Sequence, residues 1–251
     1  MNRTGLAIAL LIGAVVGLVF GFYPQLDIAI AGWFYDPVTH SFVGKNESIV
    51  QVRDAATYVI AALVAPAVLA ILGKLVMPKR RMLIPGRAAL FLTVSLALGP
   101  FLIANVGLKN VWGRMRPIDI VQFGGADRFT PWWNASGPCA ENCSFVGGEA
   151  ASAFWTLAPA ALAPPQWRPL AYAAAIAFGS GIGVLRMAGG GHFFTDIVFA
   201  GVFMFLVVWA LYGAIYRWRR TRLTDQDVEG PLERGGNAMR GWFGGEKRQS
   251  S

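Results

Sequence analysis

His192 and Asp196 are the residues whose types and spacing point most directly to chemistry. They stand four positions apart, and Arg186 and three glycines precede them. On a helix this spacing places both side chains on one face. A carboxylate that accepts from one imidazole nitrogen fixes the tautomer and stabilises the protonated ring, so that the other nitrogen is free to act. A single histidine at a helix end is more often structural, so its neighbours decide the interpretation.

Lys109 and Arg116 form a second candidate group. They are seven positions apart, two helical turns, and we expect them on one face of a helix that ends at the following proline. A planar guanidinium beside an ammonium group suits a phosphate ligand. Ordinary cations at a membrane interface are the alternative for this pair taken alone.

Gly147 and Gly148 precede Glu149 and form a third group, where an apolar stretch begins. The free backbone N–H groups of a helix N-terminus bind anions, and glycine allows a close approach. A carboxylate in the first turn also stabilises the helix dipole, so helix capping is the alternative. All three groups stand at the ends of apolar stretches, which are the elements that must position them.

Six apolar stretches dominate the chain and predict an all-α, polytopic membrane protein. Of the 251 residues, 55% are hydrophobic and 14% are charged, and the mean hydropathy is +0.48. These values exclude an ordinary soluble domain and a disordered chain. A helix of about 20 apolar residues crosses a bilayer core. The stretches span residues 5–22, 55–76, 88–108, 148–163, 169–185 and 193–215. The fourth and fifth are short and rich in alanine, so buried helices are the alternative for those two.

Basic residues predict the orientation, because lysine and arginine concentrate in cytoplasmic loops. The net charge is +8, and one side of the predicted membrane protein carries Arg3, Lys79, Arg80, Arg81, Arg87, Arg168, Arg217, Arg219, Arg220 and Arg222. We therefore expect both termini in the cytoplasm and the three polar groups on the periplasmic side. The first stretch could instead be a signal peptide. Its 18 apolar residues exceed the usual length of about 7–15, which favours a retained helix.

Cys139 and Cys143 fall in one loop on the same side as the polar groups. An oxidising periplasm would allow a disulfide between them, and two free thiols are the alternative. No further Cys or His lies nearby to complete a zinc site, and we expect neither a metal nor a cofactor.

Two domains are expected: residues 1–216 form the membrane domain, and residues 217–251 form a basic cytoplasmic tail without fixed structure. The arginines at the start of this tail suit anionic lipid headgroups. No basic face with a fold of its own is visible, so a nucleic-acid partner is not expected.

Two motifs resemble those of a known family. The run Lys109–Pro117 fits K-x6-R-P, and the run Arg186–Asp196 fits R-x5-H-x3-D. Their order, spacing and membrane setting resemble the first and third motifs of the type 2 phosphatidic acid phosphatase superfamily. The resemblance implies a bundle of six transmembrane helices with the active site at the outer leaflet.

The resemblance also implies roles for the polar groups. His192 would attack phosphorus to form a phosphohistidine, while Asp196 stabilises the imidazolium. Three cations would hold the phosphate oxygens: Lys109, Arg116 and Arg186. No metal takes part in this mechanism.

The middle motif departs from the family pattern P-S-G-H and reads Val146-Gly147-Gly148-Glu149. Gly147 lacks the serine hydroxyl, so backbone N–H groups at Gly147 and Gly148, or a neighbour, must supply the missing phosphate donor. Glu149 stands at the position of the acid/base histidine. It would protonate the leaving oxygen and then activate water if burial kept it protonated; otherwise it would only orient water.

A phosphate site at a membrane surface predicts a lipid substrate with a phosphorylated headgroup. The candidates are lipid A, undecaprenyl diphosphate, phosphatidylglycerophosphate and phosphatidate. We favour lipid A, because the middle motif resembles that of a bacterial lipid phosphatase subgroup. The wide loop before Cys143 also holds Trp132 and Trp133, which suit sugar rings or, alternatively, the interfacial belt.

Two other functions are compatible with the same sequence. One is an undecaprenyl diphosphate phosphatase, and the other is a non-catalytic binder of lipid phosphates. The expected location is the inner membrane of a bacterium, with the lipid bilayer and a lipid phosphate as partners. The oligomeric state is left open.

Overall fold

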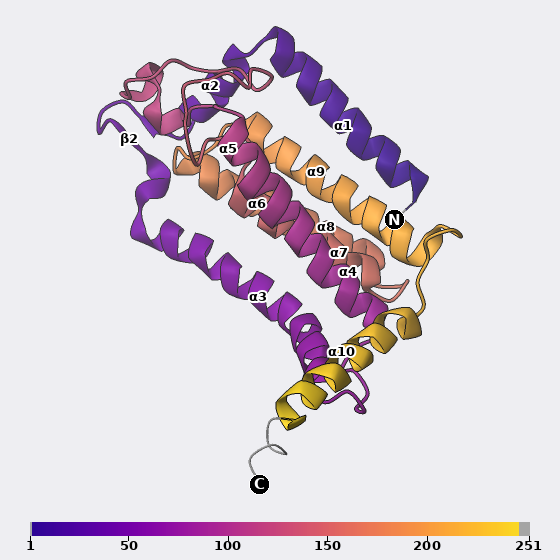
Figure 1. The fold of residues 1–251 in the computed structure, drawn as a ribbon. Helices are drawn as coiled ribbons and strands as arrows, with labels where there is room; N and C mark the ends of the chain where they lie inside the picture. The colour runs from indigo at the N-terminus through magenta and orange to yellow at the C-terminus, as the bar shows by residue number, and fades with distance from the viewer. Residues whose placement is uncertain (1, 246–251) are drawn as a thin grey trace. The chain divides into compact units, whose positions relative to one another are not determined.

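The protein is mainly helical. The computed structural model describes residues 2–245 and contains two short strands, β1 (Tyr35–Asp36) and β2 (Ser41–Phe42), besides its helices (Figure 1). The α-helices are α1 (Arg3–Phe22), α2 (Gln25–Gly32), α3 (Glu47–Val76), α4 (Gly86–Leu96), α5 (Lys109–Val111), α6 (Gly148–Phe154), α7 (Leu157–Leu162), α8 (Arg168–Ala188), α9 (Phe194–Tyr212) and α10 (Asp225–Gly245). The 3-10 turns are η1 (Val43–Lys45), η3 (Pro117–Asp119) and η4 (Val121–Phe123), and the wider π-helical segments are η2 (Ala97–Leu108) and η5 (Gly213–Arg217).

The chain divides into two compact units. The first comprises Met1–Ile60 and Ser95–Trp209, and the second comprises Ala61–Val94 and Ala210–Ser251. The three polar groups found in the sequence all belong to the first unit. The candidate site is therefore built within this unit alone.

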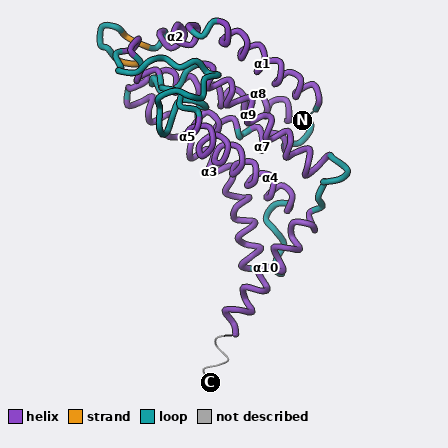
Figure 2. The backbone as a smooth tube through the Cα atoms, turned by 45° about the horizontal axis from the view of Figure 1, so that its top comes forward, coloured by secondary structure: helices purple, strands orange, loops and turns teal. Residues whose placement is uncertain are grey.

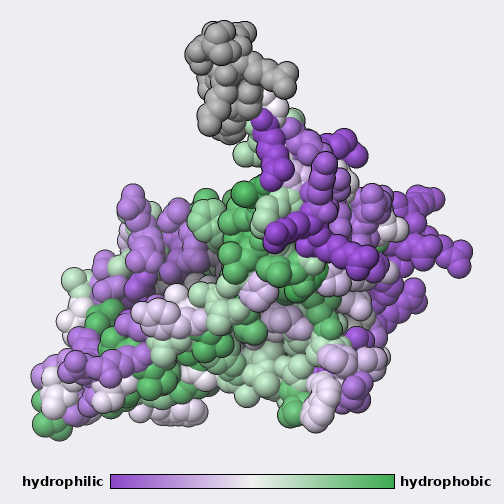
Figure 3. All heavy atoms as spheres, turned by 90° about the horizontal axis from the view of Figure 1, so that it is seen from below, coloured by the Kyte–Doolittle hydropathy of each residue, from purple (hydrophilic) through white to green (hydrophobic). Residues whose placement is uncertain are grey.

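Five described helices are long and apolar enough to cross a membrane. They are α1, α3, the continuous helix Gly86–Val111 formed by α4, η2 and α5, then α8, and the helix Phe194–Arg217 formed by α9 and η5. Large apolar side chains such as Leu11, Leu18 and Phe22 are exposed along α1. Hydrophobic residues also lie at the surface of the face drawn in Figure 3. These features define a multi-pass membrane protein.

The fourth predicted stretch differs from the expectation, because it forms two short helices, α6 and α7, instead of one long helix. The interruption falls at Trp155 and Thr156. Pro159 has no N–H to donate to the Trp155 carbonyl, and both the N–H and the hydroxyl of Thr156 bond to Ala153 O, at 3.1 and 2.6 Å. Counting apolar residues cannot detect this break, and the stretch is not among the five long apolar helices.

Glycines let α8 pack closely on its neighbours in the first unit. A Cβ added at Gly179 would collide with the Phe154 ring of α6, and one at Gly183 would collide with Ile197 of α9. Removing the side chain at these points lets helix backbones approach, as is common in membrane helices. This packing fixes α8 and α9, and the turn between them carries His192.

The turn between α8 and α9 is held by an aromatic cluster. β1 and β2 pair antiparallel with Tyr35 opposite Phe42, and Phe42 packs with Ile120, Phe123 and Phe193. Gly190 has a φ of +69° and lies against the Phe42 ring, so a side chain at this position would suffer both strain and collision. Much of the segment between α5 and α6 is loop, drawn in teal in Figure 2, and it supplies Ile120 and Phe123 to the cluster.

The C-terminal segment also differs from the expectation of a tail without fixed structure. Residues Asp225–Gly245 form α10 in the second unit, and residues 246–251 lie outside the described part. Thr224 begins the helix, since its hydroxyl accepts from Asp227 N at 3.3 Å while Asp227 Oδ2 accepts from Thr224 N at 2.7 Å. This is a capping box, which stabilises a helix start. Lys74 of α3 pairs with Glu233 at 3.1 Å and anchors the same helix.

Candidate active site

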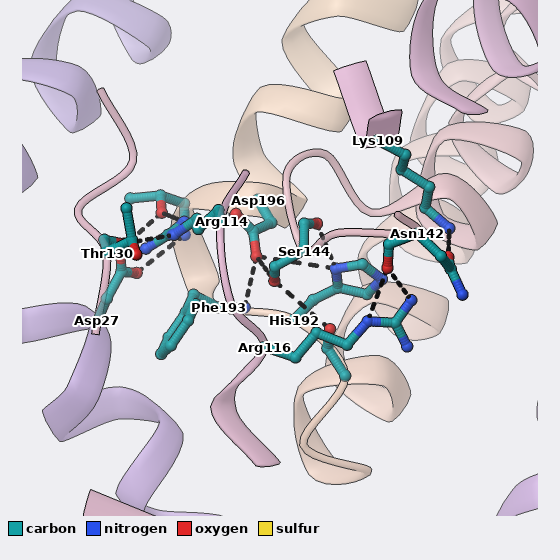
Figure 4. Close-up of polar contacts among 12 residues, drawn as sticks. Asp27, Lys109, Arg114, Arg116, Thr130, Asn142, Ser144, His192, Phe193 and Asp196 are labelled. Atoms are coloured by element: carbon teal, nitrogen blue, oxygen red, sulfur yellow. Dashed lines mark hydrogen bonds and ion pairs between the residues drawn. The ribbon is translucent and has the colours of Figure 1, made fainter. Parts of the chain in front are cut away.

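His192 lies in the turn just before α9 and is 1% exposed. Its Nδ1 lies 2.7 Å from the carbonyl oxygen of Ser144 (Figure 4). A carbonyl oxygen can only accept, so Nδ1 carries the proton and Nε2 holds the lone pair. No described residue is bonded to Nε2. The imidazole therefore presents a nucleophilic nitrogen in a fixed orientation.

Asp196 lies in the first turn of α9, with its Oδ2 3.7 Å from His192 Nδ1. That distance is an electrostatic contact rather than a hydrogen bond. Its close partners are Ser144 Oγ at 2.5 Å, Phe193 N at 2.8 Å and Nη1 of Arg114. The prediction that His192 and Asp196 share a helix face is wrong, because α9 begins after His192. The two are nevertheless adjacent, since Asp196 caps the start of the helix.

Burial sets the protonation of His192. Desolvation lowers the pKa of its imidazole from 6.5, and the positive charges of Arg186 and Lys109 add to this effect. The neighbouring Asp196 carboxylate acts in the opposite direction. The imidazole is therefore neutral at neutral pH, the state in which Nε2 can attack.

A buried ion-pair network stands behind Asp196, and sequence reasoning missed it. Arg114 is fully buried, and its guanidinium pairs with both Asp196 and Asp27 of α2, the latter at 2.7 Å. It also donates to Thr195 Oγ1 at 2.8 Å and to Thr130 O at 3.0 Å. A guanidinium with carboxylates on two sides holds Asp196 in one position and keeps it ionised.

Asp27 completes this network from a distant part of the chain. Besides Arg114, it accepts from the hydroxyl and the N–H of Thr195 at 2.6 and 3.1 Å. Burial raises the pKa of Asp27, while the Arg114 guanidinium opposes the rise. The signal in the sequence is slight: one carboxylate in the apolar run Gln25–Gly32, and an arginine two positions before Arg116.

Lys109 and Arg116 converge on one loop residue. Lys109 Nζ donates to Asn142 Oδ1 at 3.2 Å, and Arg116 donates twice to Asn142 O, at 3.2 and 2.6 Å. They do not share a helix face as predicted, because α5 ends at Val111 and Gly113 turns the chain with a φ of +51°. Arg116 follows in extended conformation. The two cations meet through the loop rather than through a helical repeat.

A disulfide closes the loop around Asn142. Cys139 and Cys143 are bonded, with their Cα atoms 5.7 Å apart. Asn142 has a φ of +51°, a conformation that asparagine tolerates better than most residues. The bridge thus holds the backbone carbonyl that both Arg116 nitrogens contact.

Glu149 is not buried, contrary to the condition for its acid role. Its side chain is 47% exposed and lies 3.5 Å from both Arg53 and Arg186. Arg186 itself is largely covered, and its Nε is buried without a hydrogen-bond partner in the described chain. Glu149 thus lies at the edge of the site, within reach of water and beside two guanidinium groups.

The two glycines bring α6 close to the polar groups. α6 begins at Gly148, and a Cβ added there would lie 3.1 Å from Lys109 Nζ. A Cβ at Gly147 would lie 3.6 Å from the His192 ring. The helix start, the imidazole and the Lys109 ammonium therefore surround one region. No group of three metal-ligating side chains occurs within residues 2–245.

Trp132 and Trp133 have different settings. Trp132 packs against Phe145 and Phe199, and its indole N–H donates to Gly17 O at 3.2 Å. It is therefore part of the core rather than a free surface for a sugar ring. Trp133 is 47% exposed and is the one of the two that is available for such a contact.

These elements define a helical membrane protein with a buried histidine close to several cations, and comparison places it in a family. Residues 88–220 match the PAP2 superfamily, and the chain belongs to this family. The resemblance seen in the two sequence motifs is thereby confirmed.

Relatives with printed functions are similar over different lengths. The chain is 35% identical over 219 residues to a lipid A 4'-phosphatase of Francisella tularensis subsp. novicida, covering 86% of this chain and 98% of the relative. It is 40% identical over 116 residues to a lipid A 4'-phosphatase of Rhizobium leguminosarum, covering 46% of this chain and 49% of that protein. No solved structure matches the chain significantly.

Proposed function

We propose that this protein is an integral membrane phosphatase that releases phosphate from lipid A through a phosphohistidine at His192. The observation that carries the proposal is the buried imidazole, whose Nδ1 is bonded to Ser144 O while Nε2 is free. Similarity to relatives named lipid A 4'-phosphatase supports the choice of lipid. Both the intermediate and the substrate belong to the proposal.

In the first step, the Nε2 lone pair attacks phosphorus and the bond from phosphorus to the lipid oxygen breaks. Lys109, Arg116 and Arg186 hold the three equatorial oxygens, where charge gathers as the phosphoryl group transfers. Asn142 supports this arrangement by accepting from two of these cations. Gly147 and Gly148 leave room for the phosphate. The Gly147 N–H donates to Asp196 O at 3.4 Å, so the N–H of Gly148, the first residue of α6, is the backbone donor that stands in place of the family serine.

Attack at Nε2 leaves a positive charge on the imidazole ring, and Asp196 stabilises it from 3.7 Å. Ser144 O continues to accept from Nδ1, so the ring does not turn. Arg114 and Asp27 act as positioning residues, because they hold Asp196 without touching the substrate. The buried network therefore supports the intermediate as well as the fold.

In the second step, the Glu149 carboxylate takes a proton from the water that breaks the nitrogen–phosphorus bond. Its exposure of 47% gives water access, and Arg186 orients it. The leaving lipid oxygen takes its proton from solvent on the same side. General base assistance of this kind contributes about 100- to 10,000-fold to rate.

The membrane arrangement proposed is six spans, with α6 and α7 together forming the fourth. Both termini then lie in the cytoplasm, and the site faces the periplasm of a bacterial inner membrane. The distribution of basic loops supports this orientation. Residues 1–216 form the catalytic membrane domain, and residues 217–251 form the cytoplasmic tail.

The proposal is tested by phosphate release from detergent-solubilised lipids. Lipid A, undecaprenyl diphosphate and phosphatidate are compared, with His192→Ala as the matched inactive control. The expected result is the highest kcat/KM with lipid A and no release by the variant. A higher kcat/KM with undecaprenyl diphosphate than with lipid A would overturn the choice of lipid A as substrate. If the protein released phosphate from none of the lipids, the proposal that it is a phosphatase would fail.

A further inference from the structure

A cavity of about 330 Å³ adjoins the active site, because Arg186 of the predicted phosphate clamp is one of its lining residues. Its walls come from η1, from the start of α3 and from the end of α8, all in the first unit. Arg186 is the shared element, because it lines this cavity and also belongs to the proposed phosphate clamp. The catalytic steps above leave the cavity unused.

The charges around the cavity are unbalanced. Its walls contain three cations, Lys45, Arg53 and Arg186, and the described residues that line it include no carboxylate. Lys45 is exposed and has no ion-pair partner within residues 2–245. Glu149 pairs with Arg53 and Arg186, and Asp54 pairs with Arg53 at 2.7 Å, which leaves the Lys45 side of the cavity positive.

Arg186 supplies a second observation that points to a ligand. Its Nε is buried and has no hydrogen-bond partner among residues 2–245, although a buried unpaired donor costs about 1–3 kcal/mol. One nitrogen of the same guanidinium already contacts Glu149. Because the Arg186 guanidinium contacts Glu149 with one nitrogen, its remaining N–H donors can bind an anion in the cavity.

We propose that this cavity binds a second anionic group of the lipid headgroup, a phosphate other than the one that is cleaved. The inference rests on the proposed function, because it concerns how the same substrate is held. Lys45 and Arg53 would contact the second phosphate, and Arg186 would lie between it and the phosphate that His192 attacks. The enzyme thereby favours headgroups that carry two separated phosphates over those that carry one.

The cavity volume agrees with this assignment. At about 330 Å³ it lies at the lower end of the range of small-molecule sites, which run from about 300 to 1,000 Å³. A phosphate and part of its sugar ring fit within such a space. Ile49 and Leu185 supply apolar wall surface for the ring.

The test uses Lys45→Gln, because Lys45 lies outside the catalytic machinery. The full chain in detergent is assayed with bisphosphorylated lipid A and with a monophosphorylated lipid A that retains the cleaved phosphate. The expected result is a KM about tenfold higher for the bisphosphorylated lipid, since one charge-assisted contact is lost, with no change for the monophosphorylated lipid. Lys45→Arg is expected to restore the native KM. Arg128→Gln, which removes an exposed cation that does not line the cavity, serves as the matched control.

The outcomes separate the inference from the proposed function. If Lys45→Gln changed the KM equally for both lipids, or for neither, the second phosphate site would be overturned. The proposed function would still stand, provided that the native chain released phosphate from these lipids. A change confined to inhibition by added inorganic phosphate would assign the cavity to the free product and would also overturn it. If the native chain released phosphate from neither lipid, both the proposed function and this inference would fail.

Discussion

Arg114 and Arg116 stand two positions apart, yet substitution by methionine should destabilise the fold strongly at Arg114 and hardly at all at Arg116. Arg114 is fully buried and donates to Thr130 O, Thr195 Oγ1, Asp27 and Asp196. Arg116 donates to the single acceptor Asn142 O, near solvent. Methionine preserves much of the side-chain length in both cases, so the loss of the guanidinium is what the comparison measures.

The magnitudes follow from burial. Removing one partner of a buried ion pair costs about 3–5 kcal/mol, and Arg114→Met leaves two carboxylates uncompensated, at 1% and 0% exposure. For a chain of this size that corresponds to a fall in apparent Tm of about 6–20 °C. Arg116→Met breaks solvent-exposed contacts, for which a change of about 0.5 kcal/mol is usual. Arg116→Met should instead remove a contact that stabilises the charge of the transition state, so kcat/KM should fall by about 100- to 1,000-fold.

The assay is thermal unfolding of the detergent-solubilised variants alongside phosphate release. Arg114→Lys is the conservative control: it keeps the charge, loses the fork of donors, and should fall between the native protein and Arg114→Met in Tm. Arg116→Lys should recover part of the activity. A native Tm for Arg114→Met, or an equal loss of Tm for Arg116→Met, would refute the division between a buried positioning network and an exposed clamp.

Three further predictions concern the chemistry. Glu149→Gln should slow hydrolysis of the phosphoenzyme by about 100-fold, so rapid-quench experiments should find more labelled protein at steady state; unchanged turnover would remove the base role. In the pH profile of kcat/KM, the midpoint of the acidic limb should lie below pH 6.5, because burial lowers the pKa of His192 and only the neutral ring can attack. A midpoint above pH 6.5 would contradict this. Cys139→Ser should raise KM with little change in kcat, since the bridge to Cys143 holds Asn142; a fall in kcat at constant KM would argue against that role.

Local sequence patterns predicted the helices well because hydrophobicity is a local property. Five of the six stretches correspond to long apolar helices. The fourth was misjudged because the count of apolar residues gives no weight to Pro159, which disrupts the bonding at Trp155. The tail was misjudged for a related reason. Its glycines suggest disorder, whereas the Thr224–Asp227 capping box favours a helix start.

The site was harder to predict, because its geometry depends on contacts between distant segments. The motif spacing selected Lys109, Arg116 and His192, but it suggested helical faces where the chain instead turns at glycines. Asn142 and Ser144 contribute backbone carbonyls to Arg116 and His192 besides their side-chain contacts, and no side-chain pattern reveals a backbone contact.

Asp27 is the clearest case of a residue outside the reach of local patterns. It pairs with Arg114 across 87 positions, so neither periodicity nor a short motif connects the two. A lone carboxylate in an apolar helix is nevertheless a usable signal, because a buried charge requires a partner. That signal indicates that a partner exists without identifying it.

Trapping the phosphoryl group on the protein is the decisive test of whether His192 carries it during turnover. Native protein is mixed with lipid A labelled at its phosphates and quenched under alkaline conditions, which preserve a phosphohistidine; His192→Ala and His192→Asn serve as controls. We expect label on the native chain, confined to the peptide that contains His192, and none on either variant. Equal labelling of His192→Ala, or label on another residue of the native chain, would contradict it.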